Sequence, residues 1–205
     1  MVAGSLCVGL LLLIVFKVLR QAHPAAAPEM ANVGAESARE GPAGDVAGSA
    51  GGATPPDISQ MTPRERFDRL FNRIMQAAQQ GDTAQVLRFT PMALGAYTQL
   101  DSIDADARYH AAVLRMQVGD FPGALALADT ILKRNPGHLF GYMIRGSVAE
   151  FQNDTTRLRQ AEHDFRSHFT AESAGGRPEY QEHEAVIEDF NQHAAESDTS
   201  AKTRR

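Results

Sequence analysis

Histidine and carboxylate side chains are the groups in this sequence that could hold a metal or transfer protons. The chain has seven histidines, with His163 and His168 five residues apart, and His183-Glu184 begins like the zinc motif His-Glu-x-x-His. That motif requires a second histidine one helical turn later, where this chain has Ile. The sequence therefore predicts no metal site and no cofactor. Acids nearby, such as Glu182, are interpreted as a solvated helix face.

Other motifs that carry chemistry are missing from the sequence. No Gly-rich loop ends in Gly-Lys-Ser/Thr to cradle a phosphate, and no Gly-x-Ser-x-Gly presents a nucleophile. The single cysteine, Cys7, excludes an intrachain disulfide and a cysteine-based zinc site. We therefore expect a protein that is not an enzyme and has no small-molecule substrate. The alternative is a metal-dependent hydrolase built on His163, His168 and His183.

The charge balance argues against a nucleic-acid partner. The formal net charge is -5, whereas binding to nucleic acid normally needs clustered Lys and Arg that displace counterions from phosphates. We therefore expect a protein partner.

Composition divides the chain into four regions. Residues 1–20 contain an apolar run that can span a bilayer core if Lys17 reaches outward, so we predict a single transmembrane anchor, with a cleaved signal peptide as the alternative. Residues 21–60, rich in Ala, Gly and Pro, are predicted to be a disordered linker. Residues 61–196 show helical periodicity, and residues 197–205 are predicted to be a disordered tail.

Two signals disagree about the side of the membrane. Lys17 and Arg20 follow the apolar run, which by the positive-inside rule places the rest of the chain in the cytoplasm. Long domains behind N-terminal anchors are nevertheless translocated largely regardless of charge. We expect the folded region on the extracytoplasmic, periplasmic side of a bacterial-type envelope.

Three two-residue turns divide the periodic region into helical hairpins. Gly81-Asp82, Gly119-Asp120 and Asn153-Asp154 each join a residue that tolerates the left-handed conformation to an Asp that can cap the next helix. The last two turns are 34 residues apart and the first two are 38 apart. A spacing near 34 is typical of stacked helical hairpins.

Local signals set the expected limits of several helices. A capping box in Thr62-Pro63-Arg64-Glu65 predicts the start of the first helix. Thr90-Pro91 predicts a kink or a break into two short helices. A final helix is expected to begin near Glu179 and to cover the last hairpin.

Residues 105–138 resemble a tetratricopeptide repeat, a 34-residue helical hairpin with small residues at fixed places, a Gly-Asp-aromatic turn and a late Pro. The next unit matches this pattern in part, and the unit before it keeps only the turn and the helix lengths. The resemblance implies an all-α fold, a short α-solenoid of about three hairpins plus a C-terminal capping helix. The residues that carry the resemblance are Ala112, Gly119, Asp120, Phe121, Ala124, Ala128, Pro136, Gly146, Asn153 and Asp154.

The resemblance also implies a concave groove lined by the first helix of each hairpin. The Lys, Asn and Arg with which some family members clamp a peptide carboxylate are absent from these places. An apolar groove with Met suits an amphipathic helix or an extended apolar peptide. The alternative is that these side chains belong to the core or are covered by the C-terminal helix. The candidate groove residues are Phe71, Met75, Tyr109, Val113, Met116, Phe140, Met143 and Ser147.

The order of anchor, linker and hairpin stack predicts a function. We expect a membrane-tethered scaffold or adaptor that mediates protein–protein interactions. The alternative is that the protein is a permanent structural subunit of a larger membrane complex, since the same order of regions would suit that role.

Overall fold

The structure, a computed structural model, describes residues 61–203. Over this range the chain forms eight α-helices and no β-strand, which confirms the predicted all-α fold. No helix of this range is both long enough and apolar enough to cross a membrane. The predicted anchor, residues 1–20, and the predicted linker, residues 21–60, lie outside the described residues.

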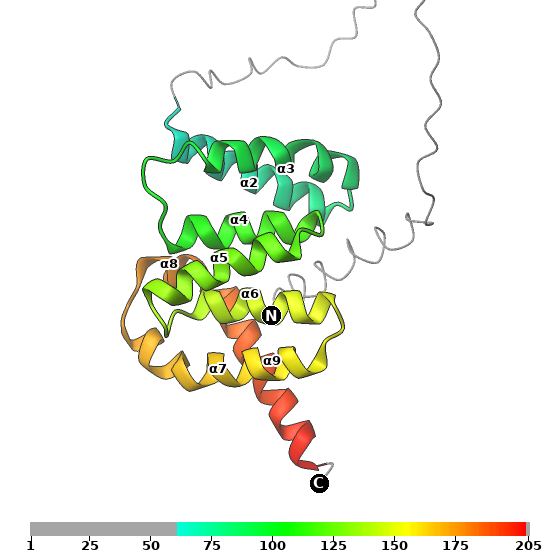
Figure 1. Ribbon diagram of the computed structural model, residues 1–205, viewed down its shortest axis with the longest axis vertical. Helices are drawn as coiled ribbons and strands as arrows, with labels where there is room; N and C mark the ends of the chain where they lie inside the picture. The colour runs from blue at the N-terminus through cyan, green and yellow to red at the C-terminus, as the bar shows by residue number, and fades with distance from the viewer. Residues whose placement is uncertain (1–60, 204–205) are drawn as a thin grey trace, which may run out of the picture.

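Six of these helices form three hairpins that stack on one another (Figure 1). A short C-terminal segment of two more helices, α8 and α9, follows the third hairpin. The hairpins are α2 (Pro63–Gln79) with α3 (Thr83–Tyr97), α4 (Ala105–Gln117) with α5 (Phe121–Arg134), and α6 (Leu139–Phe151) with α7 (Thr155–Ala174); the segment is α8 (Pro178–Glu182) and α9 (Glu184–Thr203).

The three predicted turns join the two helices of each hairpin. Gly81, Gly119 and Asn153 all have positive φ, at 71°, 76° and 55°, a conformation that glycine and, less readily, asparagine adopt. The aspartate that follows each of them accepts a hydrogen bond from a backbone N–H in the first turn of the next helix. The capping box at Thr62 and Glu65 is also present.

Two apolar clusters hold the stack together. The first lies within the α2–α3 hairpin and reaches α4 through residues such as Phe67, Val86 and Leu114. The second joins the other two hairpins to the C-terminal segment, and it includes Phe140 and Phe165, both fully buried. Each hairpin therefore buries its apolar face against its neighbours, as stacked repeats do.

Helix α3 continues through Pro91, so the alternative of two short helices is wrong. Pro91 removes one backbone N–H from the helix. The buried side chain of Thr90 donates to the carbonyl oxygen of Val86, one turn earlier in the helix, at 2.8 Å. Burial of Val86, Ala93 and Tyr97 on both sides of Pro91 then keeps the two halves of the helix in line.

The C-terminal segment differs from the single helix expected from Glu179. A break at His183 separates α8 from α9, and α9 continues past Ser197 to Thr203. Helix α9 packs against α7 and α6, crosses them, and extends beyond the stack (Figure 1). The break places the His183 side chain next to α4 rather than along the surface of a continuous helix.

Candidate functional site

The predicted groove residues gather on one face of the stack, but the C-terminal segment covers this face. Tyr109 stacks on Phe140 with ring centroids 4.3 Å apart, and the Tyr180 ring of α8 meets the edge of Phe140 at 5.5 Å. Ile187 of α9 belongs to the same cluster. Of the eight candidates, five are buried, namely Tyr109, Val113, Met116, Phe140 and Met143, and three are partly buried, namely Phe71, Met75 and Ser147.

The repeat-signature residues include small side chains buried between helices and residues that form turns. Ala112, Ala124 and Ala128 are fully buried. A Cβ added to Gly146 would lie 2.6 Å from the Phe190 ring of α9, so the side chain of Phe190 uses the space that this glycine leaves. Phe121 comes directly after the Gly119-Asp120 turn, and its ring stacks on Phe151. Pro136 follows the end of α5. Asn153 and Asp154 form the turn of the last hairpin.

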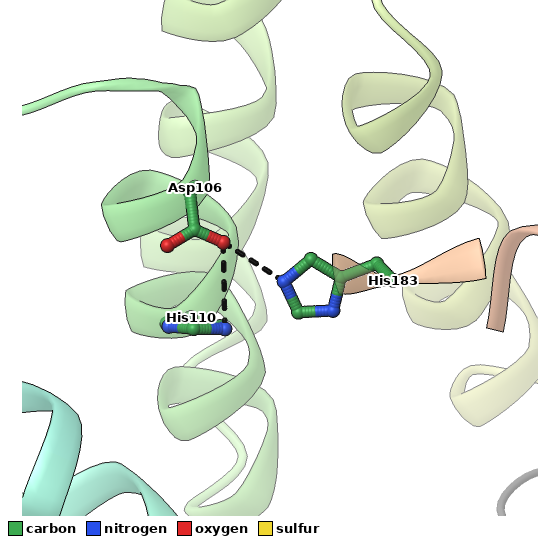
Figure 2. A group of neighbouring side chains, drawn as sticks. All are labelled: Asp106, His110 and His183. Atoms are coloured by element: carbon green, nitrogen blue, oxygen red, sulfur yellow. Dashed lines mark hydrogen bonds and ion pairs between the residues drawn. The ribbon is translucent and has the colours of Figure 1, made fainter. Parts of the chain in front are cut away.

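A polar cluster lies at the join between the hairpin stack and the C-terminal segment. Asp106 and His110 stand one turn apart on α4, so both side chains point to the same side of the helix. The Nε2 atom of His183 lies 2.8 Å from Asp106 Oδ1, and the Nε2 atom of His110 lies 3.5 Å from the same oxygen. Figure 2 shows both imidazoles directed toward one carboxylate oxygen. We call these three residues the Asp–His–His cluster.

A charged network fixes the carboxylate of this cluster. Arg64 forms an ion pair with the second oxygen of Asp106 and also binds Asp104 and Asp68, both at 2.9 Å. The guanidinium therefore leaves Asp106 Oδ1 directed at the two histidines.

Burial and charge shift the pKa values of the cluster in ways that favour neutral His110 and ionised Asp106. Burial lowers the pKa of His110 to about 4, so its ring is neutral at pH 7. Burial raises the pKa of Asp106, but the hydrogen bond from His183 and the charges around it outweigh that effect, and its pKa lies below the usual value.

Aromatic rings surround the two imidazoles. The His110 ring stacks on Phe71 with centroids 3.9 Å apart, and the rings of Tyr109 and Phe140 both lie 5.2 Å from the His183 ring. Neither ring nitrogen of His110 makes a hydrogen bond within residues 61–203. The cluster thus combines an apolar wall with a buried imidazole whose Nδ1 has no hydrogen-bond partner within residues 61–203 and whose Nε2 has only the 3.5 Å contact with Asp106.

The chemistry of this cluster is that of a metal-ligand set or a hydrogen-bonded anchor. Two imidazole nitrogens and one carboxylate oxygen, all within 4.8 Å of one another, are donors that divalent transition metals accept. The sequence reasoning found His183 but missed Asp106 and His110. An Asp-x-x-x-His spacing on a helix was the available signal.

The other histidines of the hydrolase alternative lie elsewhere. His163 is exposed on α7 beside Asp164, and the His168 ring stacks on Tyr142. Neither of them joins His183 in a metal-ligand group within the described part of the chain.

A second surface feature lies on the first hairpin, away from the C-terminal segment. A hollow of about 440 Å³, which we call the α2–α3 groove, has a largely apolar lining that includes Leu70, Phe89 and Met92. Arginines surround it. The Arg73 guanidinium lies 4.0 Å from the Phe89 ring centroid, and the Arg88 guanidinium lies 5.5 Å from it. Arg73 lines the groove together with Arg66 and Arg69, whereas Arg88 lies next to Phe89 outside the lining.

Comparison with known proteins adds no family to this description. No protein-family model matches the chain, and no curated protein matches it.

Proposed function

We propose that the chain is a tetratricopeptide-like scaffold that binds a protein partner while residues 1–20 tether it to a membrane. The fixed turn spacing, the buried small residues of the α4–α5 hairpin and the stacked hairpins support the scaffold part of the proposal. The apolar run of residues 1–20 and the composition of residues 21–60 support the tether.

The observation that carries the binding role is the α2–α3 groove. The first hairpin has no preceding hairpin within the described residues, so its outer face leaves apolar side chains in contact with water. Met92, which lines the groove, is 55% exposed, and Leu87, which lies on α3 outside the lining, is 49% exposed. Apolar side chains gathered in a groove with a polar rim are typical of a protein-binding surface.

The charge at the rim indicates the chemistry of the partner. Arg66, Arg69, Arg73 and Arg88 form no ion pair with a carboxylate within residues 61–203, and the buried Nε of Arg66 lacks a hydrogen-bond acceptor there. Arginine side chains bind carboxylates in two-point contacts and also lie flat on aromatic rings. We therefore propose an acidic amphipathic helix as the occupant, with its apolar face on Phe89.

The proposed binding surface is not the concave groove that the resemblance to tetratricopeptide repeats implies. The C-terminal segment already covers the predicted groove, and Tyr180 and Ile187 bury the aromatic side chains there. A partner helix would have to displace α8 and α9 to reach Tyr109 or Phe140, whereas the α2–α3 groove is open.

The test is a binding measurement with two synthetic helical peptides. One peptide carries Leu on one face and Glu on the other, and the second replaces every Glu by Lys. With the full chain in nanodiscs, fluorescence anisotropy should show salt-sensitive binding of the Glu peptide only. The double variant Arg69→Glu, Arg73→Glu should weaken that binding by about tenfold or more, since each exposed charge pair contributes up to about 1 kcal/mol.

The matched control is Arg159→Glu, which changes an exposed arginine on α7 and should leave binding unchanged. Equal binding of both peptides, or no binding, would contradict the proposal. In native membranes, a photo-crosslinking residue at position 92 should capture a protein that the same group at position 159 does not. Deletion of residues 1–20 should move the protein from the membrane fraction to the soluble fraction.

A further inference from the structure

We propose that the Asp–His–His cluster binds one zinc ion, which fastens the C-terminal segment to α4. The ligands are Asp106 Oδ1, His110 Nε2 and His183 Nε2. The site is separate from the α2–α3 groove, and its role is structural.

The distances in the cluster are close to those of a zinc site. Zinc with nitrogen and oxygen ligands at about 2.0–2.2 Å in a tetrahedron holds its ligand atoms roughly 3.2–3.6 Å apart. Here Asp106 Oδ1 lies 2.8 Å from His183 Nε2 and 3.5 Å from His110 Nε2. All three ligand atoms lie within 4.8 Å of one another. Small rotations of the side chains therefore suffice to enclose an ion, with the fourth position left for water.

The second observation is that, within the described residues, the ring nitrogens of His110 have no hydrogen bond, and that their one polar contact there is the 3.5 Å approach of Nε2 to Asp106. Both ring nitrogens are buried and make no hydrogen bond within residues 61–203, although buried polar atoms in proteins are nearly always paired. A neutral imidazole keeps a lone pair on one of its two ring nitrogens. A metal ion between Asp106 and His183 would give that lone pair a partner.

The charges around the cluster also fit a divalent cation. Asp68, Asp104 and Asp106 all form ion pairs with Arg64. Three carboxylates and one guanidinium together carry a formal charge of two negative units. A doubly charged ion neutralises them. Two imidazoles favour zinc and similar borderline metals over Mg²⁺ and Ca²⁺, which prefer oxygen ligands.

The ligands come from two parts of the chain that are far apart in the sequence, so an ion bound to them would connect these parts. His183 is 77 residues away from Asp106 in the chain and stands at the break between α8 and α9. The aromatic rings of Phe71, Tyr109 and Phe140 surround the imidazoles and limit the approach of water. An ion here would therefore hold α8 and the start of α9 against the covered face of the stack, and would stabilise the folded state by binding it alone.

The experiment measures zinc binding to the full chain in nanodiscs after treatment with a chelator. Isothermal titration should show one zinc ion per chain, and zinc should raise the thermal unfolding midpoint while Mg²⁺ does not. His110→Gln and His183→Gln each remove one ligand, so each should lower zinc affinity at least about 100-fold, because changes to groups that only orient a ligand already cost about 10–100-fold.

The control is His163→Gln, which changes an exposed histidine outside the cluster and should bind zinc as the unaltered chain does. Unfolding midpoints of the metal-free variants, compared with the metal-free parent, show whether each variant is folded. Limited proteolysis at Gly175-Gly176 gives a second readout, because zinc should slow cleavage in the parent chain but not in His183→Gln. Absence of stoichiometric binding in the parent, or full affinity in His110→Gln, would overturn the proposal.

Discussion

At the scale of single residues, the buried histidines stand out because aromatic rings surround them. His138 is 3% exposed and lies 5.1 Å from the rings of both Phe140 and Tyr180. It caps α6, accepting the Phe140 N–H, and its other nitrogen meets Glu179 of α8 at 3.3 Å. Burial lowers the pKa of His138, and the hydrogen bond to Glu179 only partly opposes this effect.

This burial predicts a loss of stability in mild acid. Unfolded histidine titrates near pH 6.5, whereas folded His138 titrates lower. The unfolded state therefore binds more protons as the pH falls, so the stability present above about pH 6.5 is lost progressively between that pH and the lower folded pKa. Urea unfolding in the presence of a chelator, at pH 7.5, 6.5 and 5.5, should show a falling free energy of unfolding.

The variant His138→Asn should make that decline less steep. Asn is a good helix cap and does not titrate, so it keeps the hydrogen bond to α6 and removes the proton uptake on unfolding. His110, whose pKa is also lowered, keeps part of the pH dependence. A slope equal to that of the parent chain would contradict the assignment to His138.

At the scale of helices, Pro91 is a local defect that packing overrides. The residue lies inside α3 and is exposed, while Val86 and Ala93 on either side are fully buried. Proline inside a helix is about 3 kcal/mol less favourable than alanine. The variant Pro91→Ala should therefore raise the free energy of unfolding by about 1–3 kcal/mol.

Pro122 provides the control for this prediction. It lies in the first turn of α5, where its missing N–H has no helical partner to lose. Denaturant unfolding of Pro122→Ala should show a change of less than about 0.5 kcal/mol. An equally small change in the free energy of unfolding for Pro91→Ala would contradict the prediction, because it would show that the proline fits α3 without strain.

At the scale of the whole molecule, the docking of the C-terminal segment depends on close packing at Gly146. A Cβ there would meet the Phe190 ring at 2.6 Å, and overpacking of this kind costs about 1–3 kcal/mol. Gly146→Ala should therefore destabilise the fold by about that amount and make α9 more sensitive to protease. Adding Phe190→Ala should remove part of the effect, because the two changes share one contact.

Gly95 is the matched glycine for this test. It also lies inside a helix, α3, but a Cβ there would meet nothing within 4 Å. Gly95→Ala should stabilise the fold by up to about 1 kcal/mol, since alanine favours the helix. An equal gain from Gly146→Ala would show that α9 does not depend on this contact.

Local sequence signals predicted most of the helical framework. The Gly119-Asp120 and Asn153-Asp154 turns and the Thr62 capping box are recovered because each depends on residues within one turn of the chain. Of the two outcomes expected at Pro91, a kink or a break, the break is wrong, because the local preference of proline says nothing about burial on both sides of it.

The chain's own sequence thus determined an all-α stack of hairpins and the residues on its apolar face. Only the tertiary structure decided what covers that face, because apolar periodicity reports burial without naming the partner. The same limit hid the Asp–His–His cluster. Asp106 and His110 are one turn apart, but His183 reaches them from 77 residues away, across a break that no local pattern marks. Contacts of that separation depend on how the helices stack, not on the residues beside each ligand.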